Sequence, residues 1–209
     1  MNNKSLNHDS RKDKETAIFA AACRVIREKG YHQARMADIA AAAGISYGLV
    51  YHYFRSKPDL FDALIEEWWR PLEEMTGRLV SADLPVEEKL RAIAWYFLDE
   101  YEKRPDLVHI FITEFSRSSA NLTPERLQRF KNLMARTEEI LRSAQGTGAI
   151  RTDLKARYLT YFFLGSVEAL LSTMVLENQP LKDRNLKKRL ADAVLTAFLE
   201  GARPVNKEG

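Results

Sequence analysis

The chain has 209 residues, which suffices for one or two domains with a buried core. Its 45% hydrophobic and 29% charged residues exclude a disordered chain and a collagen. The single cysteine, Cys23, excludes an internal disulfide and favours a reducing compartment. Only nine glycines and seven prolines interrupt the chain, so long helices fit this composition better than many short strands.

Charge is distributed unevenly along the chain. Residues 1–60 hold ten Lys or Arg against six Asp or Glu, whereas residues 61–209 hold 22 against 23. The whole positive excess therefore lies in the first sixty residues. This asymmetry favours a small anion-binding module ahead of a neutral body, but a solvated surface with uneven charge would give the same count.

The predicted elements are all helices. Residues 1–12 are polar, so we expect a flexible arm and no signal peptide. The first helix is expected at 13–29, because Gly30 is suited to end it with a left-handed cap. No segment alternates with period two, so the sequence predicts an all-α chain of about nine helices. The later ones are expected at about 36–43, 47–54, from 57 onward, and at 86–103, 105–118, 123–145, 153–178 and 183–202.

The most informative segment is 35–57, where a short helix ends at Gly44 and Ser46 is placed to cap a second one. Two short helices joined by such a turn form a helix-turn-helix pattern. At 100° per residue, one arc of the second helix holds Tyr47, Gly48, Tyr51, His52 and Arg55, and the opposite arc holds Leu49, Val50, Tyr53 and Phe54.

The arc that begins with Tyr47 offers hydroxyls, rings, an imidazole and a guanidinium, which suit phosphates and base edges. Gly48 costs a helix about 1 kcal/mol relative to Ala, a cost explained if a partner must approach closely. Each residue alone is more often a packing or surface residue. The combination and its spacing favour DNA binding.

The stretch from Gly30 to Leu60 resembles the DNA-binding module of TetR-family transcriptional regulators. The residues that carry the resemblance are Gly30, Tyr31, Asp38-Ile39-Ala40, Ala43-Gly44-Ile45-Ser46, Gly48, Tyr51, Tyr53-Phe54, Ser56-Lys57 and Leu60. The family usually has Thr before the second helix, as a cap and phosphate contact, where this chain has Ala34 and Arg35. It also often has His at the position of Tyr53. The resemblance implies DNA contacts from Arg35, Ser46, Tyr47, Gly48, Tyr51, His52, Tyr53 and Lys57.

The sequence thus divides into a flexible arm at 1–12, a helix-turn-helix domain at 13–58, and a ligand-binding and dimerisation domain at 59–209. The apolar run 158–176 has Glu168 at its middle, so we expect a buried helix rather than a membrane span. A family homodimer implies a four-helix interface, although a monomer core fits the pattern equally well. The interface candidates are Gly165, Ala169, Ser172, Leu190, Val194 and Phe198.

Aromatic and long apolar residues in the second domain could line an apolar pocket or form plain core. The candidates are Trp68, Phe97, Tyr101, Phe111, Phe115, Tyr161, Phe163, Leu170 and Met174. The elements Tyr31-His32-Gln33 and Thr113-Glu114 resemble the fatty-acid-degradation branch of the family, which implies a long-chain acyl-CoA effector. Phosphates of CoA could then meet Arg117, Arg126 and Arg129, and a polar head group could meet His109 and Glu114. Pro71 would kink the fourth helix or separate two helices.

No P-loop, zinc-ligand, dinucleotide or nucleophile-elbow motif is present, so we expect no catalytic residue, metal or cofactor. The favoured function is a cytoplasmic, homodimeric repressor that binds a near-palindromic DNA operator and is released by a small apolar or amphipathic effector. Two alternatives stay open. One is a helical small-molecule-binding protein or enzyme that does not bind DNA, and the other is an adaptor whose helix-turn-helix binds protein.

Overall fold

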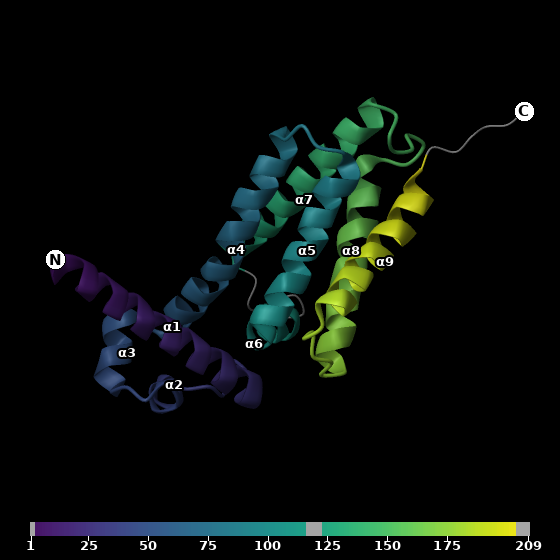
Figure 1. Cartoon of the computed structure of the whole chain (residues 1–209). Coiled ribbons are helices and arrows are strands. Elements are labelled where there is room, and N and C mark those ends of the chain that lie inside the picture. Colours follow the sequence, from purple (N-terminus) through teal and green to yellow (C-terminus); the bar gives the residue numbers. More distant parts are fainter. Residues whose placement is uncertain (1–2, 116–122, 204–209) are drawn as a thin grey trace, which may run out of the picture. The chain divides into compact units, whose positions relative to one another are not determined.

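The computed structural model describes the backbone of residues 3–115 and 123–203 and the side chains of residues 11–113 and 123–203. Within these ranges it contains nine α-helices and no strand, which confirms the predicted all-α fold (Figure 1). The helices are α1 (Asn3–Lys29), α2 (Met36–Ala43), α3 (Tyr47–Tyr53), α4 (Lys57–Ser81), α5 (Val86–Lys103), α6 (Pro105–Ile110), α7 (Pro124–Gly146), α8 (Ala156–Leu176) and α9 (Arg184–Ala202).

Three predicted boundaries need correction. Helix α1 begins at Asn3, so residues 3–12 are helical where a flexible arm was expected. The helix expected at 105–118 ends its α-helical part at Ile110 and continues as a π-helical turn, Phe111–Phe115, and the rest of that prediction lies outside the described residues. Helix α4 runs through Pro71 without interruption, so the alternative of two separate helices was wrong.

The chain divides into two compact units. The first extends to Trp68 and includes a segment that begins at His109, and the second starts at Trp69 within α4. This division lies ten residues beyond the expected boundary at 58/59, because α4 contributes residues to both units.

The first unit is built around α1, which packs on α2, and α2 packs on α3. Its core combines aliphatic residues such as Ile18, Ile39 and Val50 with the buried aromatic residues Phe61 and Trp68. Gly44 has φ 67°, a left-handed conformation that glycine adopts without strain, and this turn ends α2. Helix α2 therefore ends at Gly44, as predicted from the sequence.

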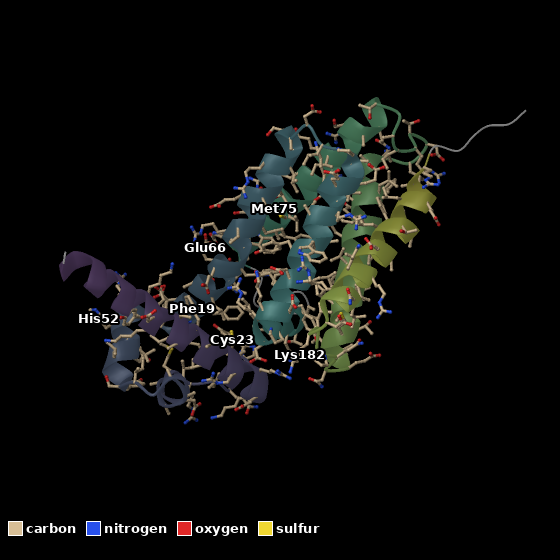
Figure 2. All side chains as sticks on the ribbon, in the orientation of Figure 1. Phe19, Cys23, His52, Glu66, Met75 and Lys182 are labelled. Atoms are coloured by element: carbon tan, nitrogen blue, oxygen red, sulfur yellow. The ribbon has the colours of Figure 1, made fainter. Side chains whose placement is uncertain are left out.

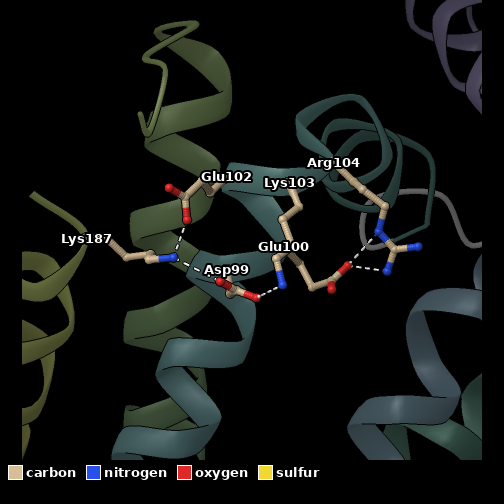
Figure 3. A network of polar contacts seen from close by, with 6 residues as sticks. All are labelled: Asp99, Glu100, Glu102, Lys103, Arg104 and Lys187. Atoms are coloured by element: carbon tan, nitrogen blue, oxygen red, sulfur yellow. Dashed lines mark hydrogen bonds and ion pairs between the residues drawn. The ribbon is translucent and has the colours of Figure 1, made fainter. Parts of the chain in front are cut away.

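The second unit is a helical bundle in which α5 packs against α7, α8 and α9, and α8 also packs against α7 and α9. Phe163 of α8 is fully buried, and its ring centroid lies 5.3 Å from that of Phe198 on α9. Figure 3 shows a polar link between α5 and α9, in which the ammonium group of Lys187 lies 2.9 Å from Asp99 and also contacts Glu102. The bundle is thus held by a buried apolar core that includes this aromatic pair, and by a charged link between α5 and α9.

Candidate functional site

Helix α3 is positioned by its cap and by its buried side. The Ser46 hydroxyl oxygen accepts a hydrogen bond from the backbone N–H of Leu49 at 3.3 Å, as expected for a cap residue. Val50 is fully buried and Phe54 nearly so, and the Phe54 ring centroid lies 5.4 Å from that of Phe19 on α1. Because this side packs inward, the arc that begins with Tyr47 is left in solvent.

The exposed arc of α3 carries two tyrosines that contact each other. Tyr47 is 54% exposed and Tyr51 is 39% exposed, and their ring centroids lie 4.8 Å apart. The hydroxyl oxygens of Tyr47 and Tyr51 lie 3.2 Å apart, within hydrogen-bond distance. Gly48 lies beside Tyr47, and a Cβ atom added there would meet no atom within 4 Å. The fold itself therefore does not require glycine at this position.

His52 and Tyr53 lie at the C-terminal end of α3, and His52 is labelled in Figure 2. His52 is exposed, and its ring meets the half-buried ring of Tyr53 edge to face, with centroids 5.8 Å apart. The guanidinium carbon of Arg11 on α1 lies 5.8 Å from the Tyr53 ring centroid. Sequence reasoning missed Arg11 because it assigned that residue to a flexible arm.

Arg35 precedes α2 at the position where the family usually has a capping Thr. Its side chain is exposed, and its backbone N–H donates to the Asp38 carboxylate at 3.1 Å. Lys29 lies 3.0 Å from the same carboxylate. These two donors, Lys29 first, hold the pKa of Asp38 below its ordinary value. The hydrogen bond from the backbone N–H before α2 to the Asp38 carboxylate, which is one of the two bonds of a capping box, is therefore retained although the Thr is absent.

Lys57, a predicted phosphate contact, makes three hydrogen bonds within the first unit. Its ammonium group donates to the backbone carbonyls of Tyr31 at 2.7 Å, His32 at 3.0 Å and Ala34 at 3.0 Å. It also lies 4.6 Å from the centroid of the Tyr31 ring. An ammonium group has three N–H donors, so these carbonyls occupy all of them. The geometry gives Lys57 a positioning role between the loop after α1 and the start of α4.

Arg55 follows α3 and was placed on its polar arc but left out of the expected contacts. Its side chain is exposed, and its backbone N–H donates to the Asp59 carboxylate at 2.8 Å. Arg35 and Arg55 thus give the first unit two exposed cations close in sequence to α2 and α3.

The expected pocket residues are divided among several environments. Trp68 is buried with its ring centroid 4.0 Å from that of Phe111, and Tyr101 donates to the backbone carbonyls of Met174 and Gln179 at 3.1 and 2.7 Å. Phe97 and Leu170 are half-buried, Phe163 is in the bundle core, and Tyr161 is 49% exposed. The side chain of Phe115 lies outside the described residues.

The expected polar partners of an effector also differ in their surroundings. Arg126 is buried, and Arg129 forms an ion pair with Glu73 of α4 at 3.2 Å. His109 is half-buried, and its carbonyl accepts a hydrogen bond from the Thr113 hydroxyl at 2.9 Å. Arg117 and the side chain of Glu114 lie outside the described residues.

An open groove of about 670 Å³ lies between α4 and α5 in the second unit. Its lining contains none of the expected pocket residues and consists of Met75, Glu88, Arg91, Ala92, Trp95, Tyr96 and Asp99, of which Met75 is labelled in Figure 2. Burial raises the pKa of Tyr96. Sequence periodicity gave no signal for this groove, because its lining comes from the partly exposed side of α5.

Helix α8 exposes an apolar side. Four of its large residues, Tyr158, Tyr161, Phe162 and Leu176, are 46–65% exposed, and Gly165 and Ala169 are exposed beside them. Ser172 is buried and donates a hydrogen bond to Glu168 at 2.7 Å. By length and composition α8 would suit a membrane span, but half of its apolar window is buried within the chain.

The interface candidates on α9 are less exposed than those on α8. Leu190 and Val194 are half-buried, and Phe198 is buried against Phe163. The structure therefore leaves Gly165 and Ala169 open to a partner and places Phe198 inside the bundle of one chain.

Comparisons with known proteins agree with the helix-turn-helix geometry. Residues 18–64 match the family described as bacterial regulatory proteins, tetR family. The fatty acid metabolism regulator protein of Bacillus subtilis is 25% identical over 169 residues, which cover 81% of this chain and 87% of that protein. The HTH-type transcriptional repressor DhaR of Mycobacterium sp. is 24% identical over 185 residues, which cover 88% of this chain and 91% of that protein.

A solved structure extends the similarity to the fold of both units. The transcriptional regulator FadR from Bacillus subtilis, in complex with stearoyl-CoA, superposes with a TM-score of 0.75 at 24% identity. The superposition covers 90% of this chain and 99% of that one. Residues 18–64 thus match the tetR family of bacterial regulatory proteins, and over most of its length the chain is similar in sequence and fold to bacterial transcriptional regulators.

Proposed function

We propose that this regulator is a cytoplasmic repressor that binds a near-palindromic DNA operator as a homodimer and is released by an amphipathic effector with a long acyl chain. The observation that carries the DNA-binding part is the exposed arc of α3. Tyr47 and Tyr51 point their hydroxyls into solvent there, and Gly48 keeps open a space that the fold does not use. Such a surface suits close approach to base edges and phosphates in a major groove.

The proposed DNA contacts come from exposed groups around α3. The side chains of Arg35 and Arg55 are exposed cations suited to phosphates, and His52 offers ring nitrogens. Ser46, Tyr47, Gly48, Tyr51 and Tyr53 complete the set retained from the sequence. Lys57 supports this surface by joining the loop after α1 to the start of α4.

The proposed dimer forms through the exposed side of α8. Contiguous exposed apolar side chains mark sites of protein association. Gly165 and Ala169 allow close approach of a second helix, while Tyr161 and Phe162 supply area to bury. Two copies of α3 would then contact two half-sites, which gives an affinity that one helix of seven residues lacks.

The effector class is supported by the relatives. The similar structure of FadR holds stearoyl-CoA, and the similar Bacillus subtilis protein is named a fatty acid metabolism regulator. The second unit supplies buried apolar residues suited to an acyl chain, among them Tyr101, Phe163 and Met174. Arg126 and Arg129 supply cations for the phosphates of CoA.

The test begins with selection of operators from a pool of random DNA duplexes by the full chain. Fluorescence anisotropy then measures affinity for a selected duplex and for the same duplex with one half-site scrambled. We expect saturable binding. The logarithm of the association constant should fall linearly with the logarithm of the salt concentration, with a slope of about −0.9 per neutralised phosphate. Addition of stearoyl-CoA should reverse binding, whereas stearate alone and CoA alone serve as matched controls.

Two results would contradict parts of this proposal. If no duplex is enriched and binding is absent at low salt, the chain functions without DNA, as a helical small-molecule-binding protein. If binding is specific but stearoyl-CoA leaves the affinity unchanged, the chain is a DNA-binding regulator with a different effector.

A further inference from the structure

The carboxylate of Glu73 on α4 is held by two donors from α7, all within the second unit. One oxygen lies 3.2 Å from a guanidinium nitrogen of Arg129, and the other accepts a hydrogen bond from the side-chain amide of Asn132 at 3.5 Å. An ionised carboxylate has no donor, so the N–H bonds must come from α7. Gln128 donates to the amide oxygen of Asn132 at 3.0 Å and fixes that amide in its orientation. These α7 side chains therefore form a donor site for an anion, and Glu73 occupies it.

The carboxylate of Glu73 is held loosely in this site. Hydrogen bonds between a guanidinium and a carboxylate usually have nitrogen–oxygen distances of about 2.7–2.9 Å. Both distances to Glu73 are longer. The side chains of Arg129 and Glu73 are 31% and 23% exposed, and ion pairs in contact with solvent contribute little to stability. A ligand that offers Arg129 a stronger anion can therefore displace the carboxylate at small cost.

Arg136, two turns further along α7, contacts the same part of α4 without using the carboxylate. Its guanidinium donates to the backbone carbonyl of Glu73 and, at 3.4 Å, to the hydroxyl of Thr76. A Cβ atom added at Gly77 would lie 3.7 Å from the guanidinium carbon of Arg136, so this group lies against the α4 backbone. The Glu73 carboxylate can thus leave Arg129 while Arg136 keeps its contact with α4.

A phosphoryl group is the anion best suited to replace this carboxylate. A terminal phosphate carries more negative charge than a carboxylate near neutral pH and has three oxygens that accept hydrogen bonds. The fork of N–H bonds on arginine matches carboxylates and phosphates alike, so a site that holds Glu73 has the chemistry to hold a phosphate. A second carboxylate, in contrast, would replace one charge by an equal one.

We propose that Arg129 and Asn132 form the subsite for a phosphoryl group of the effector, and that Glu73 is an internal competitor which this group displaces. The inference rests on the proposed function, in which the effector carries phosphates as well as an acyl chain. It adds that the chain supplies an anion of its own to that subsite. The Glu73 carboxylate therefore lowers the affinity for a phosphorylated effector and raises the effector concentration at which the chain responds.

The experiment measures binding by microscale thermophoresis with two probes. One is stearoyl-CoA, and the other is the stearoyl thioester of N-acetylcysteamine, which keeps the acyl chain and the thioester and lacks every phosphate. The variants are Glu73→Gln, Arg129→Gln and the double variant, all in the full chain. Glu74→Gln and Lys131→Gln, at exposed positions on α4 and α7, are the matched controls for loss of charge. Thermal melting checks that each variant keeps its fold.

Glu73→Gln should bind stearoyl-CoA about fivefold more tightly than wild type, because the competing charge is removed from Arg129. Arg129→Gln should bind it about tenfold less tightly, because a charged hydrogen-bond donor to the phosphate is lost. Once Arg129 is replaced, Glu73→Gln should change this affinity by less than about twofold. The affinity for the phosphate-free thioester should stay within about twofold of wild type in every variant, and both controls should bind stearoyl-CoA as wild type does.

Two results with stearoyl-CoA would overturn the inference. If Glu73→Gln leaves the affinity unchanged, the carboxylate does not occupy the phosphate subsite. If the gain is equally large with and without Arg129, Glu73 repels the effector from a distance and the shared site is wrong. Failure of the proposed effector is distinguishable, because wild type would then bind neither probe. Inorganic pyrophosphate then serves as the probe for the same variants: tighter binding by Glu73→Gln that requires Arg129 supports the subsite, and binding that ignores both residues overturns it.

Discussion

Helices α3 and α8 both leave aromatic rings in solvent beside a glycine with open space. On α3 the exposed rings are Tyr47 and Tyr51, and on α8 they include Tyr161 and Phe162. The difference lies in the neighbouring groups. The α3 surface has paired hydroxyls and exposed arginines close in sequence, whereas the α8 surface combines apolar side chains with small residues. The first suits the charged and polar edge of DNA, and the second suits another apolar helix.

Helices α3 and α8 can also be compared through one glycine in each, Gly48 and Gly165. A Cβ atom added at Gly48 or at Gly165 would meet nothing within 4 Å, so neither glycine is needed for packing within the chain. Glycine in a helix costs about 1 kcal/mol relative to Ala. Because Gly146 is equally open, the open space alone does not indicate a partner. The exposed aromatic rings on the same helices are what make Gly48 and Gly165 candidates for close approach by two different partners.

The largest effect is expected from a substitution that disrupts the exposed apolar side of α8. Gly165→Arg should convert the dimer to a monomer, because a long charged side chain prevents close approach of the second helix. Operator affinity should then fall by about 100-fold or more, since one recognition helix replaces two. Analytical ultracentrifugation and anisotropy measure the two effects. Gly146→Arg, at the end of α7 and with equally open surroundings, should remain dimeric.

The next largest effect tests which of two cations, Lys57 or Arg55, contacts DNA as part of the α3 surface. Lys57→Met should lower the free energy of unfolding by about 2 kcal/mol, because three backbone carbonyls lose a charged hydrogen-bond donor. It should leave the salt slope of DNA binding unchanged. Arg55→Gln should behave in the opposite way, with unchanged stability and a slope reduced by about 1. A reduced slope with unchanged stability in Lys57→Met would return that lysine to the phosphate contacts.

A smaller effect separates stability from binding at Gly48. Gly48→Ala should raise the free energy of unfolding by up to about 1 kcal/mol, because Ala is the better helix former. Operator affinity should fall by about tenfold, because the added methyl group occupies the space left for DNA. Urea unfolding and anisotropy on one preparation measure both quantities. Unchanged affinity would show that the open space has no role in recognition.

The smallest effect is expected at Asp38, which lies in the first turn of α2. Its pKa is lowered in the folded state by Lys29 and by the backbone N–H of Arg35. The stabilisation is therefore present above the ordinary carboxyl pKa and is lost as the pH falls through the lowered value. Asp38→Asn should slightly reduce the melting temperature at pH 7, with a smaller difference at pH 3. A difference that grows on acidification would contradict this account.

Sequence patterns predicted the features that depend on near neighbours. Gly44 as the turn, Ser46 as the cap and the buried arc of α3 are all set by residues within one or two turns of the helix. The resemblance to the TetR family came from the same short segment, and the family match over residues 18–64 includes it. Local rules therefore sufficed for the fold class and for the position of α3.

Features that depend on distant contacts were not predicted. Lys57 meets carbonyls 23 to 26 residues away, a partnership that no local pattern contains. Tyr161 was expected in a pocket because it is aromatic, but the packing of α8 leaves it exposed. The start of α1 was misplaced because residues 3–12 are polar, and helix formation there has no apolar periodicity to reveal it.

The most direct test of the account is the stoichiometry of the DNA complex, measured by sedimentation of a labelled operator duplex selected by the full chain. The account predicts two chains per near-palindromic duplex, with α8 joining the chains and one α3 in each half-site. The same duplex with one half-site scrambled should lose most of its affinity. A complex of one chain per duplex, with equal affinity for the scrambled duplex, would contradict the central claim that two different surfaces of this chain serve DNA and a second copy.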